Sequence, residues 1–127
     1  WLKSVKKSTI IRQKYMSDEV YEIYKKEDIL FSNYTSFREG TELYPHRDPD
    51  ILRYPYKRIQ IPLLIPDKNK CYMEWTDIKG GRMDWEEGVP QVCDVMRHTH
   101  QAYNKSNKPM DFLFVDVKLD TEVIINN

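Results

Sequence analysis

The sequence predicts a mainly β fold, a sandwich or barrel with one short helix ahead of it. Short runs rich in Ile, Val, Tyr and Phe recur from Ile29 onwards, and turn-forming pieces separate them. The sequence contains no internal repeat and no low-complexity tract. A chain of 127 residues suits one core, so we expect a single domain over residues 1–127.

The stretch SDEVYEIYKKED, residues 17–28, has the features of one short amphipathic helix. Ser17 is a good N-cap residue, and acidic residues follow it in the first turn. Val20, Ile23 and Tyr24 recur at helical spacing, and lysines gather towards the end. We therefore expect a helix at about residues 17–28.

The β core is expected at about residues 29–125. The runs that predict strands are ILFSNYTSF (29–37), YKRIQIPLLI (56–65), KCYMEW (70–75), VPQVCDV (89–95), THQAYN (99–104), MDFLFVDVKL (110–119) and TEVII (121–125). Turn-rich pieces such as PDKNK, DIKGGRMD and NKSNKP lie between them. Pro62 falls inside one of the runs, which predicts a bulge or a sheet edge at that point.

Charge and cysteine content limit the partners and the compartment. The formal net charge is +0, which gives no indication of a nucleic-acid partner. We find no apolar run near the length of a membrane span and no signal-peptide core, so no membrane partner is expected. Cys71 and Cys93 lie far apart and form no CxxC pattern, which argues against a disulfide framework and favours a cytoplasmic location.

Any histidine-based metal site depends on three residues, since the chain contains only His46, His98 and His100. His46 and Asp48 form a His-x-Asp pair, and a later histidine would complete the two-histidine, one-carboxylate set that holds iron in non-haem oxygenases. His98 and His100 are two residues apart and share a strand face, so spacing does not choose between them. Spacing alone favours a solvated polar loop, because a chain with eleven aspartates and three histidines has a chance of roughly one in four of containing such a pair.

Three blocks of the sequence carry a resemblance to a known family. They are GTELYPHRDPD; RIQIPLLIP, in which Gln60 stands where His is common; and WEEG…CDV…HQAYNKS…FLFVDV. In order and separation they resemble the aspartyl/asparaginyl β-hydroxylase-like branch of the 2-oxoglutarate and Fe(II)-dependent oxygenases, over residues of about 34–118. The resemblance implies a double-stranded β-helix (jelly-roll, cupin-like) fold, with Fe(II), 2-oxoglutarate as cosubstrate and O2.

The resemblance also implies roles for individual residues. HQAYNKS matches the family segment that begins with the second histidine, so His100 would bind the metal and act in catalysis together with His46 and Asp48. Some members of this branch lack the carboxylate ligand, which Asp48 would supply here. His98 would be a neighbour of the site, hydrogen-bonded near the pocket or packed at the end of its strand.

One position departs from the family pattern. The family places an arginine for the far carboxylate of 2-oxoglutarate ten residues after the second histidine, and this chain has Met110 there. Arg58 matches a second arginine that some members use for the cosubstrate, and Lys108 is a further candidate cation. The alternatives are that Arg58 is a surface arginine at a strand start and that Lys108 is a solvated loop lysine.

The resemblance implies an Fe(II)- and 2-oxoglutarate-dependent dioxygenase, a hydroxylase acting on an unidentified peptide or small-molecule substrate. The alternative function is a cupin-like metal- or small-molecule-binding domain that does not use 2-oxoglutarate, and Met110 is the feature that favours it. A plain β-sandwich interaction module would require all three sequence blocks to be coincidental.

Overall fold

The structure, a computed structural model, describes residues 29–50, 55–79 and 81–123. These residues contain seven strands. Their bounds are β1 (Ile29–Phe37), β2 (Tyr56–Leu64), β3 (Cys71–Trp75), β4 (Arg82–Asp84), β5 (Gln91–Cys93), β6 (His100–Asn104) and β7 (Met110–Lys118). Within those residues no helix has the length and apolar character needed to span a membrane. The helix predicted at residues 17–28 lies outside the described residues.

The predicted strands are mostly confirmed. Six of the seven runs coincide with strands, and residues 121–123 of the remaining run are not part of a strand. The structure adds β4 inside DIKGGRMD, a piece predicted to be turn-rich. β4 pairs with β3 as the second strand of a hairpin, and this pairing stabilises a three-residue strand whose own composition does not indicate one.

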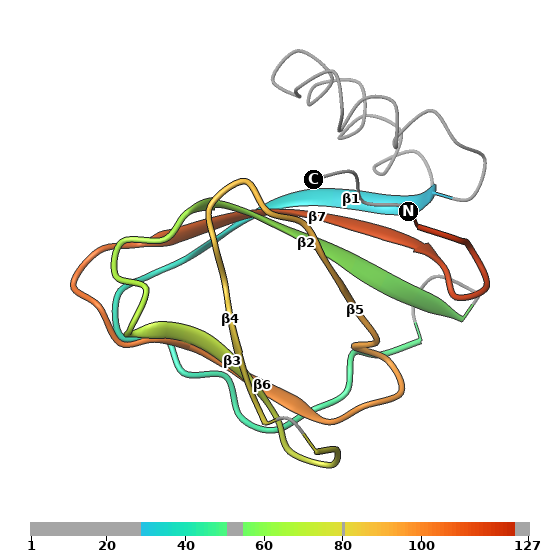
Figure 1. Cartoon of the computed structure of the whole chain (residues 1–127), viewed down its shortest axis with the longest axis horizontal. Coiled ribbons are helices and arrows are strands. Elements are labelled where there is room, and N and C mark those ends of the chain that lie inside the picture. Colours follow the sequence, from blue (N-terminus) through green and yellow to red (C-terminus); the bar gives the residue numbers. More distant parts are fainter. Residues whose placement is uncertain (1–28, 51–54, 80, 124–127) are drawn as a thin grey trace.

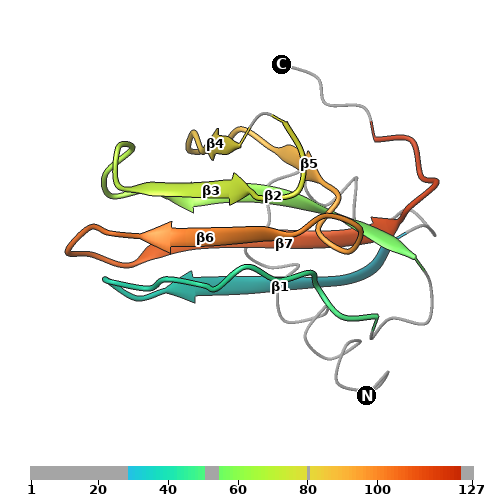
Figure 2. The ribbon, with the colours of Figure 1, turned by 90° about the horizontal axis from the view of Figure 1, so that it is seen from below.

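The strands form two antiparallel sheets that face each other, as a double-stranded β-helix requires (Figure 1). One sheet has the order β1-β7-β2-β5, and the other has the order β4-β3-β6. In the view from below, β6 of the smaller sheet overlies β7 of the larger sheet, with β1 on one side and β3 on the other (Figure 2). The predicted fold class is therefore confirmed.

Successive side chains along each strand point to opposite faces of the sheet, and those on the inner faces form the interior between the sheets. On β7, Met110, Phe112 and Phe114 belong to the cluster that includes core residues of β3. The intervening Leu113 and Val115 belong to a second apolar cluster with residues of β2. β7 is thus buried on both faces and is the central element of the larger sheet.

The proline inside β2 produces the predicted irregularity. The register between β2 and β7 shifts between Pro62 and Leu64, which is a β-bulge. Proline has no N–H to donate to the ladder, so an interior strand accommodates it where the pairing is already broken.

Asn104, the last residue of β6, ties together one end of the fold and is fully buried. Its Nδ2 donates to the carbonyl oxygens of Phe37, Arg38 and Lys108 at 2.8–3.1 Å. Its Oδ1 accepts hydrogen bonds from the backbone N–H and the hydroxyl of Ser106. The Asn-x-Ser pair within HQAYNKS therefore has a structural role, since it fixes the turn between β6 and β7.

Candidate metal centre

Main-chain pairing brings two of the three histidines together. His46 and His100 form an antiparallel bridge, and each backbone N–H donates to the other residue's carbonyl at 2.9 Å. Residues directly opposite in such a pair project their side chains to the same face. The ring centroids of His46 and His100 are consequently 4.5 Å apart.

Asp48 joins the two histidines because it lies two residues beyond His46 along the same extended segment. Its backbone N–H donates to the Val95 carbonyl at 2.9 Å, so the segment remains paired at this point. Asp48 Oδ1 lies 3.4 Å from His46 Nε2 and 3.2 Å from His100 Nε2. Two ligands at right angles on a metal with bonds of about 2.1 Å lie about 3 Å apart, so the three groups fit one ion.

The ring orientation of both histidines suits metal binding. His46 Nδ1 lies 2.6 Å from the Tyr44 carbonyl, and His100 Nδ1 lies 3.0 Å from the His98 carbonyl. A carbonyl oxygen only accepts, so each Nδ1 carries the proton and donates it. In a neutral ring the lone pair is then on Nε2, the atom that points to Asp48, and such backbone bonds hold metal-binding histidines in place.

Asp48 is itself held by an arginine, and a second carboxylate holds that arginine in turn. Arg58 Nη1 donates to Asp48 Oδ2 at 2.6 Å, on the oxygen that does not face the histidines. Arg58 Nε and Nη2 donate to the two oxygens of Asp116 at 2.8 and 3.2 Å. The guanidinium also lies 4.8 Å from the centre of the Phe114 ring. Arg58 is therefore a partner of a carboxylate that could bind a metal rather than a surface arginine.

The charges in this group oppose the effect of burial. Burial alone would raise the pKa of Asp48, but in the metal-free protein a hydrogen bond from His100 Nε2–H and the charge of Arg58 together hold that pKa below its ordinary value. A metal bound to Nε2 would take the place of this proton. Burial raises the pKa of Asp116, against the hydrogen bond from Arg58. Burial would lower the pKa of Arg58, and the bond to Asp116 raises it instead. Asp48 is thus kept ionised, the form in which a carboxylate binds a metal.

His98, the remaining histidine, lies beside the site but not in it. Its Nδ1 is 3.6 Å from Asp77 Oδ2, and its ring meets Trp75 edge-on at 6.3 Å. The same Asp77 oxygen accepts the backbone N–H of Thr99 and lies 3.4 Å from Arg47. These residues form a polar rim next to the candidate metal centre.

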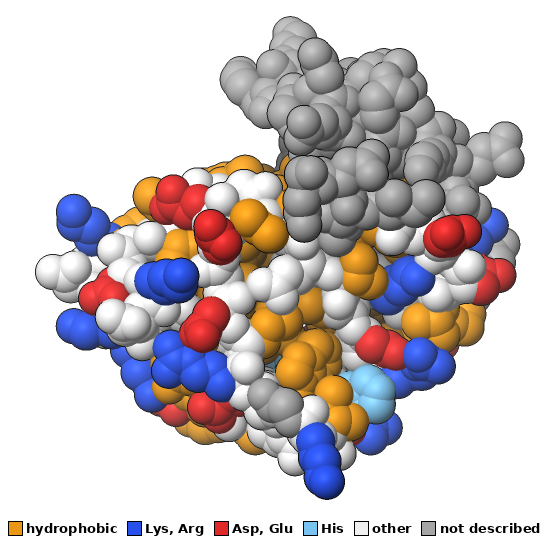
Figure 3. Space-filling view, viewed as in Figure 1, with side chains coloured by type: hydrophobic (Ala, Val, Ile, Leu, Met, Phe, Trp, Pro, Cys, Tyr) orange, Lys and Arg blue, Asp and Glu red, His pale blue; other side chains and the backbone are white. Residues whose placement is uncertain are grey.

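A small cavity of about 50 Å³ lies behind the three ligands. Arg58 and Gln60 contribute polar groups to its wall, together with the ligands. The rest of the wall is apolar and consists of Phe37, Leu43, Met73, Trp85, Ala102 and Phe114. On the face drawn in Figure 3, apolar side chains gather between the two sheets, with histidine and charged side chains beside them.

The residues around this cavity do not fit the far carboxylate of 2-oxoglutarate. Met110 is fully buried in the core cluster and offers no charge. Lys108 is exposed in the turn before β7, and it is absent from the cavity wall. Arg58, the one cation in the wall among the described residues, already faces two carboxylates.

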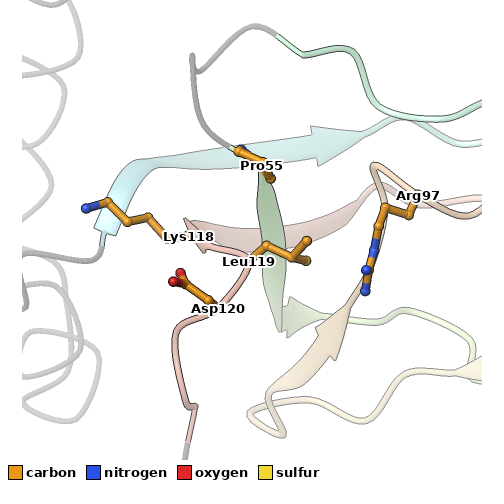
Figure 4. Close-up of a pocket in the computed structure, with 5 residues that line it drawn as sticks. All are labelled: Pro55, Arg97, Lys118, Leu119 and Asp120. Atoms are coloured by element: carbon orange, nitrogen blue, oxygen red, sulfur yellow. The ribbon is translucent and has the colours of Figure 1, made fainter.

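A larger pocket of about 600 Å³ lies elsewhere, near the end of β7 and the start of β2. Figure 4 shows Leu119 and Pro55 in its middle, with Arg97, Lys118 and Asp120 around them. Arg97 is held by Asp94 through its Nε, at 2.6 Å. None of the residues predicted to form the site lines this pocket.

Two site residues, Asp116 and Gln60, were not predicted for the roles that they have. Asp116 is in register with Arg58 and follows Met110, Phe112 and Phe114 at two-residue steps, so strand alternation was a signal that could have placed it inside. Gln60 accepts the indole N–H of Trp85 at 2.9 Å. No sequence signal connects those two residues, which are 25 positions apart.

Solved structures with this fold include several cupins. A predicted oxalate decarboxylase from Thermotoga maritima superposes with a TM-score of 0.53 at 16% identity, over 82% of this chain and 76% of that one. A cupin protein from Bacteroides fragilis gives 0.51 at 14% identity, over 75% and 70%. A non-heme monooxygenase–nickel complex gives 0.51 at 12% identity, over 71% of this chain and 44% of that one. At these identities the likeness shows the fold alone.

Sequence comparison is more specific than the fold. No curated protein matches the chain. The family described as aspartyl/asparaginyl beta-hydroxylase matches residues 14–119, which is most of the 127 residues and includes all three candidate ligands. The chain therefore belongs to the aspartyl/asparaginyl β-hydroxylase family, and it has a cupin fold with a His-His-Asp group that could hold a metal ion.

Proposed function

We propose that this protein is an Fe(II)-dependent oxygenase that hydroxylates a peptide or small-molecule substrate with O2. The observation that carries the proposal is the meeting of His46, Asp48 and His100, whose ligand atoms all lie within 4.8 Å of one another. Two histidines and one carboxylate on one face are the ligand set of non-haem Fe(II) oxygenases. Iron bound there would supply the oxygen chemistry that amino-acid side chains lack.

The protein's own groups have distinct tasks in this proposal. His46 and His100 present Nε2 to the metal because backbone carbonyls hold their Nδ1–H groups. Asp48 presents Oδ1, since Arg58 holds Oδ2 on the other side. The apolar wall behind the ligands limits water at the centre, which strengthens the electrostatic interactions inside it.

The cosubstrate separates this proposal from a second candidate. The family resemblance implies 2-oxoglutarate, but the described residues provide no free cation for its far carboxylate. A cupin-like domain that binds a metal and does not use 2-oxoglutarate is therefore the second candidate, and Met110 is the observation that favours it. Both candidates need the same three metal ligands, and they differ in oxygen consumption.

A cytoplasmic location stays a prediction.

Metal binding is tested first, by anaerobic titration of the purified chain with Fe(II) and measurement of the bound metal after desalting. We expect one Fe(II) per chain, and loss of binding in His46→Ala and in His100→Ala. His98→Ala is the matched control, because its side chain lies outside the ligand group while its backbone carbonyl still holds His100. Full metal binding in His46→Ala or His100→Ala would contradict the assignment.

The oxygenase part is tested with the iron-loaded protein in an oxygen electrode. Iron-dependent oxygen uptake in the presence of a 2-oxo acid, lost in His100→Ala and retained in His98→Ala, supports an oxygenase. Stoichiometric iron binding without uptake for any 2-oxo acid or peptide tested would favour the second candidate.

A further inference from the structure

We propose that the cavity beside the metal centre takes a ligand with one metal-chelating end and a short uncharged tail, such as a 2-oxo monocarboxylic acid, in preference to 2-oxoglutarate. The inference rests on the proposed function, because the chelating end needs a metal on His46, Asp48 and His100. The chemistry of the cavity beyond the metal ligands determines what the rest of the ligand can be.

The first argument is charge. Among the described residues, Arg58 is the only cation in the cavity wall, and it donates three hydrogen bonds to Asp48 and Asp116. A second carboxylate on the ligand would have to compete with both of these buried groups for one guanidinium. An unpaired carboxylate in an apolar cavity is very unfavourable, so a dicarboxylate is selected against.

The second argument is the chemistry of the inner wall. Apolar side chains such as Met73, Trp85 and Phe114 make up most of it. Gln60 is 4% exposed, and its Oε1 accepts the Trp85 indole N–H. Its Nε2 carries two N–H groups, and the one neighbour described for them is Met73 Sδ at 3.7 Å, a weak acceptor. The wall therefore offers a neutral donor and apolar contact, which suit an uncharged tail.

The third argument is size. The cavity of about 50 Å³ is far below the ~300–1,000 Å³ of ordinary small-molecule pockets. It holds little more than a few atoms beyond the metal. Met110, where the family has an arginine, is fully buried in the same core cluster as Phe112 and Phe114, so the position is occupied by packing rather than by a charge that faces a ligand.

The experiment compares matched 2-oxo acids on the iron-loaded chain under anaerobic conditions. Pyruvate, 2-oxobutanoate, 2-oxopentanoate and 2-oxoglutarate are titrated, and the visible charge-transfer band of a 2-oxo acid chelated to Fe(II) reports binding. The decisive pair is 2-oxopentanoate and 2-oxoglutarate, which share five carbons and differ in the terminal carboxylate. We expect the uncharged member, or one of its shorter homologues, to bind at least tenfold more tightly than 2-oxoglutarate.

Two variants test the cause of the preference. Met110→Arg supplies the missing cation and should reverse the order in favour of 2-oxoglutarate. Val92→Arg adds the same charge at an exposed position of β5 and should leave the order unchanged. The wild-type comparison stands by itself if Met110→Arg does not fold.

The outcomes separate the inference from the function on which it rests. Absence of iron binding would contradict the proposed function. Iron binding in which none of the three monocarboxylic acids binds at least tenfold more tightly than 2-oxoglutarate, or in which no acid gives a band, would overturn the inference and leave the metal centre in place.

Discussion

Replacement of Arg58 by methionine should destabilise the metal-free protein strongly, because it leaves two carboxylates without a cation. The side chain of Arg58 is 18% exposed, that of Asp48 is 10% and that of Asp116 is 3%, so solvent provides little compensation. Methionine retains most of the aliphatic stem, so the main losses are the charge and the contact of the guanidinium with the Phe114 ring.

The magnitude follows from the burial of the group. Removal of one partner from a buried ion pair costs about 3–5 kcal/mol, and we expect a loss of that size in the free energy of unfolding at pH 7. Burial already raises the pKa of Asp116, and loss of Arg58 raises it further. The folded variant then retains a proton that the unfolded chain releases, so its deficit grows as the pH rises above the ordinary carboxyl pKa and shrinks towards pH 4.

The assay is urea unfolding of the wild type and Arg58→Met in the presence of a chelator, at pH 7 and at pH 4.5. Arg47→Met is the matched control, since Arg47 is exposed and its contact with Asp77 is long, at 3.4 Å, so its unfolding midpoint should stay close to that of the wild type. Asp116→Asn in the Arg58→Met background should recover part of the loss. A deficit under 1 kcal/mol at pH 7 would refute the reasoning, because it would mean that the two carboxylates do not need Arg58.

Three further predictions concern other parts of the molecule. His46→Ala should abolish metal binding and activity while the far-UV circular dichroism spectrum and the chelated protein's unfolding midpoint stay near those of the wild type, since the side chain is 39% exposed; a large fall in the midpoint would show a structural role instead. Burial raises the pKa of the Cys93 thiol to about 12, so the folded state keeps a proton that the unfolded state loses above about pH 9, and stability should fall by roughly 1 kcal/mol per pH unit between pH 9 and 11. Cys93→Ala should remove this dependence, and equal slopes for both proteins in urea titrations would contradict the assignment. Phe112→Ala empties a fully buried site between Trp85 and Phe37 and should cost about 3–5 kcal/mol by urea unfolding, whereas a loss under 1 kcal/mol would mean that the core collapses into the space.

Much of the fold could be predicted because the strands alternate clearly and turns punctuate them. The bulge at Pro62 and the free cysteines were predictable for the same local reasons, since each depends on one residue and its immediate neighbours. β4 was missed because its three residues, RMD, include no β-branched or aromatic side chain, so only their hairpin pairing with β3 makes them a strand.

The candidate metal-binding group could be predicted in part. The His-x-Asp spacing was visible, but the choice of His100 over His98 came from a family segment, and the structure supplies the physical reason, which is the bridge between His46 and His100. The partner of Arg58 depended on the register of β2 against β7, which pairs residues 58 positions apart and has no local signature. For Arg58 the sequence offered a cosubstrate role or a surface position, and the structure places it between two carboxylates.

The backbone carbonyls that hold the two histidine rings bear on how this protein could evolve. They belong to Tyr44 and His98, and neither bond depends on the side chain at those positions. The Tyr44 side chain is exposed, and that of His98 is on the rim, so both can be exchanged without turning either ring. Mutation can therefore change both side chains beside the candidate metal centre while the orientation of the two histidine rings is inherited unchanged.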